Sequence, residues 1–94
     1  MPIDDQTLRK RLLFRSWHRG TREIDLILGR FAERHLAAMD RARLDGYEQL
    51  LQNTDPDIYN WLTGREPPPA TIGGDLWRLL TASFSPDAIE DATP

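Results

Sequence analysis

Apolar residues recur every three or four positions along most of this chain, which is the spacing that gives a helix one apolar side. The clearest example covers about residues 21–36. Its positions i, i+3, i+4 and i+7 are taken by Ile24, Ile27, Leu28 and Phe31. A helix with 3.6 residues per turn places these side chains in a single stripe. The pattern therefore predicts an amphipathic helix that packs on a core through this stripe.

The same spacing predicts four further helices, at about 7–18, 41–52, 56–62 and 74–83. The residues expected on their apolar faces are Leu8, Leu12, Leu13, Phe14, Trp17, Leu44, Tyr47, Leu50, Leu51, Ile58, Trp61, Leu62, Leu76, Trp77, Leu79 and Leu80. No stretch of useful length alternates between apolar and polar positions, as a half-buried strand would. We therefore expect an all-α protein, a compact five-helix bundle with short loops and antiparallel or crossed neighbours.

Several residues mark helix ends. Asp40 is a good N-cap for the third helix. In Asp55-Pro56-Asp57, a capping carboxylate, a proline at the first helical position and a first-turn acid predict the start of the fourth helix. Gly64 is expected to end that helix, and Pro67-Pro68-Pro69 predicts a stiff, extended spacer before the fifth.

The chain has 94 residues, which fits one domain. We expect residues 1–84 to form the helical bundle and the polar, acidic stretch 85–94 to be a disordered tail. Gly29 lies inside the second predicted helix, where a glycine costs about 1 kcal/mol against alanine. We interpret it as a residue that permits close contact between two helices.

Charge is distributed unevenly, although the net charge is only −3. Residues 1–43 hold ten Lys/Arg against six Asp/Glu, whereas 44–94 hold two against nine. A basic surface is therefore predicted on the first two helices. Its cations are Arg9, Lys10, Arg11, Arg15, Arg22 and Arg30. Most such strips are simply solvated faces, so this one does not identify a partner by itself.

The sequence disfavours most kinds of chemistry. It has no cysteine, which excludes disulfides and thiolate chemistry. His18 and His35 are too far apart in sequence for a typical metal-ligand pair. It contains no Gly-rich phosphate loop and no recognisable nucleophile. Without an apolar run near 20 residues or a signal peptide, we expect a cytoplasmic protein that does not enter the membrane and is a monomer when free.

The most informative segment is Arg19-Gly20-Thr21-Arg22-Glu23, where a basic helix meets a glycine and a second helix begins. The guanidinium of Arg19 offers five donors in a rigid fork suited to carboxylate or carbonyl oxygens. Gly20 presents backbone that no Cβ shields. Such a surface is suited to receive the main chain of another protein and fix its register.

Two interpretations of Glu23 are compatible. In the structural one, Gly20 caps the second helix and Glu23, at the N3 position, bonds back to the cap, as in half a capping box. In the functional one, Glu23 is exposed beside Arg19 and contacts a partner. Trp17 lies within one turn of the junction and is expected to be the most exposed tryptophan, although tryptophans at helical spacing are more often core residues.

Taken together, Arg19-Gly20-x-x-Glu23, the following Ile24-Asp25-Leu26 and the downstream Asp55-Pro56-Asp57-x-Tyr59-Asn60-Trp61-Leu62 resemble the SdhE-type assembly factors of succinate dehydrogenase. The resemblance covers about residues 8–64 and implies a five-helix bundle. It places the motif arginine, glycine and glutamate of that family on Arg19, Gly20 and Glu23. It also places Asp25 near the contact surface, and Arg15 and Trp17 beside it complete the predicted partner-binding set.

The resemblance implies a protein that binds the flavoprotein subunit of succinate dehydrogenase, with fumarate reductase as a second candidate partner. It would promote covalent attachment of FAD to a histidine of that partner without being an enzyme. The chain lacks a dinucleotide fingerprint, so we do not expect it to bind FAD tightly itself. The main alternative is a helix-turn-helix module that binds nucleic acid; the acidic pI of about 5.2 and the acids of the second helix oppose it.

Overall fold

The computed structural model describes residues 3–70, 72 and 74–83, and these residues form helices only. The elements are α1 (Asp5–Trp17), α2 (Arg22–His35), the 3₁₀ turn η1 (Leu36–Ala38), α3 (Arg41–Leu51), α4 (Asp55–Leu62) and α5 (Gly74–Ser83). The predicted all-α class and the five helices are confirmed. Each predicted boundary lies within two residues of the observed one, and the short η1 turn after the second helix was not predicted. The expected disordered tail, 85–94, lies outside the described residues.

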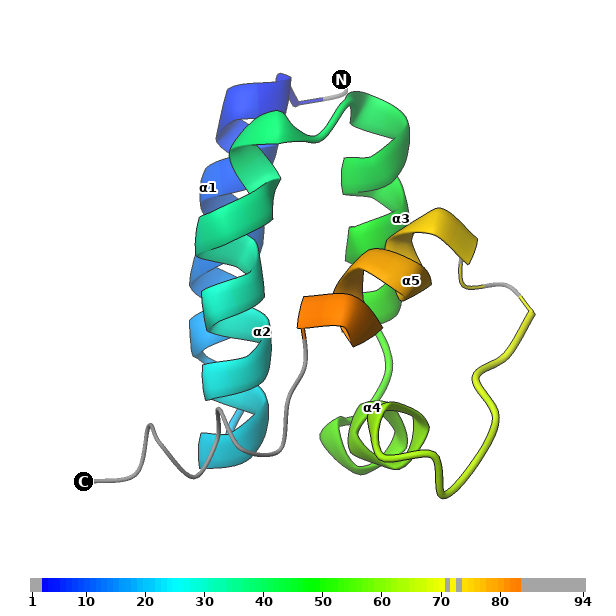
Figure 1. Cartoon of the computed structure of the whole chain (residues 1–94). Coiled ribbons are helices and arrows are strands. Elements are labelled where there is room, and N and C mark those ends of the chain that lie inside the picture. The colour runs from blue at the N-terminus through cyan, green and yellow to red at the C-terminus, as the bar shows by residue number, and fades with distance from the viewer. Residues whose placement is uncertain (1–2, 71, 73, 84–94) are drawn as a thin grey trace.

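The helices α1 and α2 form a long antiparallel pair (Figure 1). η1 turns the chain so that α3 lies beside this pair, and α4 lies near the end of the pair where α1 passes into α2. The extended spacer after α4 leads to α5, which packs on α3. Proline cannot continue a helix, so the triplet separates these last two helices in space.

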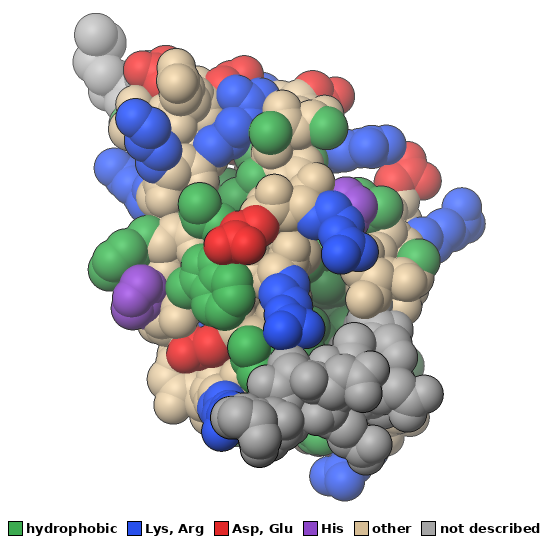
Figure 2. Space-filling model, turned by 60° about the vertical axis from the view of Figure 1, so that its left-hand side comes forward, with side chains coloured by type: hydrophobic (Ala, Val, Ile, Leu, Met, Phe, Trp, Pro, Cys, Tyr) green, Lys and Arg blue, Asp and Glu red, His purple; other side chains and the backbone are tan. Residues whose placement is uncertain are grey.

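The surface over α1 and α2 carries hydrophobic side chains among cations and carboxylates (Figure 2). The exposure of Phe14 corrects an expectation: this residue, assigned to the apolar face of the first helix, is 64% exposed. The buried residues of α1 are Leu8, Leu12 and Ser16, spaced by four along the helix. Phe14 falls outside this narrow stripe, and its ring stacks on His18 with the ring centroids 4.0 Å apart.

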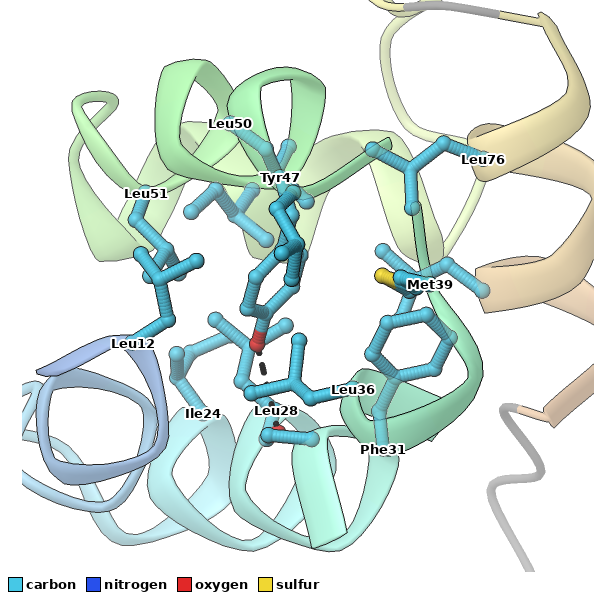
Figure 3. Packing of buried hydrophobic residues seen from close by; sticks show 14 of the residues in the cluster. Leu12, Ile24, Leu28, Phe31, Leu36, Met39, Tyr47, Leu50, Leu51 and Leu76 are labelled. Atoms are coloured by element: carbon cyan, nitrogen blue, oxygen red, sulfur yellow. Dashed lines mark hydrogen bonds between the residues drawn. The ribbon is translucent and has the colours of Figure 1, made fainter. Parts of the chain in front are cut away.

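All five helices contribute to one hydrophobic core (Figure 3). The fully enclosed side chains include Leu12, Leu28, Leu50, Ile58 and Leu80, one from each helix. Several residues expected in the core lie at its edge and are only partly buried; these are Leu13, Ile27, Trp61, Trp77 and Leu79. Trp17 is partly exposed, as expected, but Trp61 and Trp77 are partly exposed too.

A pair of hydroxyl groups joins three helices inside this core. Tyr47 of α3 places its Oη 2.6 Å from Oγ of Ser16 in α1 and 3.3 Å from the carbonyl oxygen of Leu28 in α2. Ser16 Oγ is also bonded to the carbonyl oxygen of Leu12. Burial raises the pKa of the Tyr47 hydroxyl, because its ionised form would lack water.

The helix ends are partly as predicted. Asp40 caps α3 and accepts a hydrogen bond from the backbone N–H of Arg43. The cap of α4, however, is Thr54 rather than Asp55: its Oγ1 accepts from the backbone N–H of Asp57. Asp55 is therefore the first residue of α4, and its carboxylate is available for another contact.

Gly29 permits the close contact expected of it. A Cβ at this position would lie only 2.3 Å from the indole of Trp17, which therefore packs directly on the backbone of α2. The indole Nε1–H also donates to Glu33 one turn further along α2. The close packing of α1 on α2 thus requires a residue without a side chain at position 29.

Candidate functional site

The candidate site is the junction where α1 passes into α2, together with the first turn of α4. Four residues, 18–21, connect the two long helices. Gly20 has φ of +116°, in the left-handed region that favours glycine. Any other residue there is strained even though space is available, since the nearest atom to an added Cβ is 3.9 Å away. Gly20 is therefore required by the turn, and it is exposed.

Arg19 does not present its guanidinium to the solvent, which corrects the expectation for this residue. Its Nε donates to Oδ1 of Asp55 over 2.9 Å, and its two terminal nitrogens donate to the carbonyl oxygens of Leu51 and Asn53. Its side chain is only 11% exposed and that of Asp55 only 9%. The fork does bind a carboxylate and carbonyl oxygens, as its chemistry predicts, but they belong to its own chain.

The capping role expected of Glu23 is carried by Asp25. Oδ1 of Asp25 accepts from the backbone N–H of Arg19 over 2.6 Å and from that of Gly20 over 3.3 Å. The helix cap itself is Thr21, not Gly20. The predicted half capping box is therefore wrong. It requires Gly20 as the cap, and α2 starts one residue later. Glu23 remains exposed and has no hydrogen-bond or ion-pair partner among the described residues.

A groove of about 330 Å³ opens between the first turn of α2 and α4. It is lined by Thr21, Glu23, Ile24, Asp55, Pro56 and Tyr59. Asp55, which lines the groove, pairs with Arg19, and this ion pair fixes α4 against the junction. Of the predicted set, only Glu23 lines this groove, and Gly20 adjoins it through the chain.

The remaining predicted residues lie nearby with contacts of their own. Arg15 is partly exposed and pairs loosely with Glu48 of α3 at 3.7 Å, whereas Trp17 packs on α2. Within the predicted basic strip, Arg9 is a structural residue: it donates to the carbonyl oxygens of Leu36 and Met39 and so holds the α2–α3 connection against α1.

Sequence reasoning missed Asp55 and Tyr59 as parts of the site. Asp55 was assigned as a cap because aspartate before proline is a common helix start. Thr54 offered a signal: a second capping residue directly before Asp55 leaves its carboxylate without a local role. Tyr59 was part of the quoted downstream segment, but nothing in its spacing shows that it faces the start of α2.

The described residues contain no cluster of three or more side chains suited to hold a metal ion. No helix in this part of the chain is both long and apolar enough to cross a membrane. Fold and site together define a small all-α protein with a conformationally fixed helix junction and a shallow groove beside it.

The chain belongs to the family described as flavinator of succinate dehydrogenase, whose sequence profile matches residues 10–84. It is 37% identical to succinate dehydrogenase assembly factor 2, mitochondrial, of Dictyostelium discoideum over 80% of its length and 53% of that relative. It is 43% identical to the FAD assembly factor SdhE of Acetobacter pasteurianus over 77% of its length and 66% of that protein. These names confirm the resemblance read from the two motifs.

A third relative, succinate dehydrogenase assembly factor 2, mitochondrial, of Meyerozyma guilliermondii, is 47% identical over 62% of the chain and 43% of its own length. The chain thus spans between 43% and 66% of the length of these three relatives. The expected cytoplasmic location stays a prediction, since two of the three are named as mitochondrial.

Proposed function

We propose that this chain binds the flavoprotein subunit of succinate dehydrogenase and promotes covalent attachment of FAD to it, acting as an assembly factor rather than as an enzyme. Fumarate reductase is a second candidate partner. The observation that carries the proposal is the surface formed by Gly20 and Glu23, exposed on a junction held by hydrogen bonds from Asp25 and Arg19. Membership of the flavinator family supports the same function.

The junction is suited to docking because it does not need to order itself on binding. Asp25 holds the backbone of Arg19 and Gly20, and Arg19 holds α4. Binding through a rigid surface avoids much of the entropy that loop ordering costs. Glu23 and the bare backbone of Gly20 are therefore presented in one fixed arrangement.

The expected mechanism is a shift of population in the partner. A protein that binds one domain arrangement of the flavoprotein more tightly than others increases the fraction in that arrangement. A preference of about 2–3 kcal/mol would multiply a minor, reactive arrangement roughly 30- to 150-fold. Holding flavin and histidine at reacting distance removes part of the barrier, while the groups that form the bond belong to the flavoprotein. In this proposal the chain does not hold FAD tightly itself.

The test is co-expression of the flavoprotein subunit with this chain, followed by in-gel fluorescence of covalent flavin. Gly20→Arg and Glu23→Ala are expected to lower the fluorescence several-fold. The reasons differ: arginine at position 20 covers the exposed backbone, whereas alanine at position 23 removes the exposed carboxylate.

The matched control for the glycine variant is Gly64→Arg. Gly64 also has a positive φ, +79°, and nothing lies within 4 Å of an added Cβ, so it imposes similar backbone strain away from the junction. It should support normal flavin attachment. Full attachment with both junction variants would show that the assigned surface is wrong. Loss of helical circular dichroism in both would instead assign these residues to folding.

A further inference from the structure

The groove beside the junction has a definite chemical character. Its walls are the aliphatic side chain of Ile24, the ring of Pro56 and the half-buried side chain of Tyr59. The acidic residues Glu23 and Asp55 also line it; Glu23 is exposed, whereas Asp55 is buried. No lysine or arginine lines it. Its volume of about 330 Å³ lies at the lower end of the roughly 300–1,000 Å³ typical of small-ligand sites.

The charge balance around this groove is negative. The first turns of α2 and α4 carry four acids, Glu23, Asp25, Asp55 and Asp57. Opposing them are Arg19, the exposed Arg22, and the two helix N-termini, each equivalent to about half a positive charge. About one negative charge remains. An anion would therefore be repelled although two helices begin here.

The two carboxylates that line the groove differ in availability. Asp55 is already neutralised by Arg19, and its second oxygen accepts from Thr21 Oγ1 over 3.4 Å. Glu23 is exposed and has no ion-pair partner among the described side chains. The uncompensated charge is thus localised at Glu23, which lines the groove together with the apolar residues Ile24, Pro56 and Tyr59.

We propose that this groove receives a lysine or arginine side chain of the flavoprotein, an inference that rests on the function proposed above. The cation pairs with Glu23 while its alkyl stem lies against Ile24, Pro56 and Tyr59, as long cationic side chains do on apolar surfaces. Arg19 does not touch this side chain; it is a positioning residue that sets the distance between α2 and α4. Glu23 and Tyr59 are the residues that determine specificity.

The experiment measures the affinity of the purified flavoprotein subunit for the full chain by calorimetric titration at about 50 and 300 mM salt. Glu23→Gln keeps the shape of the side chain and removes its charge. We expect it to weaken binding about tenfold at low salt and about threefold or less at high salt, because salt already screens the pair in the wild type. The control Glu33→Gln lies on the same helix away from the groove, and its amide oxygen can still accept from the Trp17 indole, so this variant should stay within twofold of the wild type.

A second pair of variants tests the apolar wall. Tyr59→Ser removes the ring and should weaken binding about tenfold at both salt concentrations, whereas Tyr59→Phe keeps the ring and should stay within twofold. Circular dichroism at the titration temperature verifies that each variant is folded.

The outcomes separate this inference from the proposed function. If the wild type binds and Glu23→Gln behaves like Glu33→Gln, the groove does not receive a cation although the function stands. Tighter binding by Glu23→Gln would indicate an anionic occupant and overturn the inference in the same way. Equal losses of affinity with Tyr59→Ser and Tyr59→Phe would show that the ring of Tyr59 does not contact the bound side chain. If the wild type does not bind the flavoprotein, the proposed function itself fails and the inference with it.

Discussion

The guanidinium of Arg19 joins the end of α1 to the α3–α4 turn and to the first residue of α4. Its bonds to Asp55, Leu51 and Asn53 place a nearly buried charge among three acceptors from a segment more than 30 residues away. The ion pair itself adds little to the free energy of folding. Removing the arginine is nevertheless costly, because it leaves a buried carboxylate without a compensating charge. The motif arginine is thus expected to affect the partner through the position of α4.

We expect Arg19→Ala to lower the free energy of unfolding by about 3 kcal/mol, because it leaves the carboxylate of Asp55 buried and without its cation. The measurement is urea denaturation followed by circular dichroism. Arg30→Ala, which removes an exposed arginine from α2, should change stability by no more than about 0.5 kcal/mol. A loss below about 1 kcal/mol in Arg19→Ala would show that water reaches and solvates Asp55.

At the scale of helices, the chain uses glycine inside an element for two different purposes. Gly29 in α2 lies under the indole of Trp17, with a distance of 2.3 Å to an added Cβ. Gly46 in α3 faces Leu76 of α5 at 3.6 Å, an ordinary contact distance. A side chain at position 29 would therefore alter the α1–α2 spacing, whereas a methyl group at position 46 would fit at ordinary contact distance.

These two glycines predict opposite effects for the same substitution. Gly29→Ala should destabilise the protein by about 1 kcal/mol, because overpacking of about 1–3 kcal/mol exceeds the helix propensity that alanine gains. Gly46→Ala should stabilise it by up to about 1 kcal/mol, since only the propensity changes. The measurement is the melting temperature of each variant compared with that of the wild type. Stabilisation by Gly29→Ala would mean that the Trp17 ring moves aside at little cost.

At the scale of the whole molecule, α1, α2 and α3 meet at the hydroxyl of Tyr47. Its bonds to Ser16 and to the Leu28 carbonyl lie inside an otherwise apolar core. A buried polar group of this kind is favourable only when its partners are present in the right geometry. The hydroxyl therefore favours one arrangement of the three helices over others of similar apolar burial.

Tyr47→Phe should cost about 1–2 kcal/mol at neutral pH, because the hydrogen bonds of one buried hydroxyl are lost. The pKa of Tyr47 is raised in the folded state above its ordinary value of 10.0. Its contribution is therefore complete below pH 10 and is lost as the pH rises further, since the unfolded chain then releases the proton first. Denaturation at pH 7 and above pH 10 should show that the difference in free energy of unfolding between wild type and variant becomes smaller at the higher pH. A difference that stays the same would mean that Tyr47 ionises as easily in the folded protein as in the unfolded chain.

The five helices and most of the core were predictable from the sequence. The signals that define them act over only a few residues: apolar spacing, the cap at Asp40 and the breaks at glycine and proline. They can therefore be recognised in the sequence without knowledge of any tertiary contact. The largest departure is Phe14, whose spacing fits an apolar face but whose side chain is exposed. Local periodicity defines a stripe only to within about one residue on either side, and packing selects the side that is covered.

Residue types alone direct attention to the junction at Gly20, and its role in binding a partner stays a prediction. The sequence left Glu23 with two interpretations, and the structure shows that this residue is exposed while Asp25 makes the capping bonds. The partner of Arg19 is decided only when α4 packs against the junction, because Asp55 lies 36 positions away. The same packing places Tyr59 and Pro56 opposite Glu23 and creates the groove. Sequence by itself thus determined the helices and the junction, since local propensity and capping suffice for both. Only the tertiary structure decided which charged side chains pair with each other inside the protein and which stay exposed, because most of those pairs join residues far apart in the sequence.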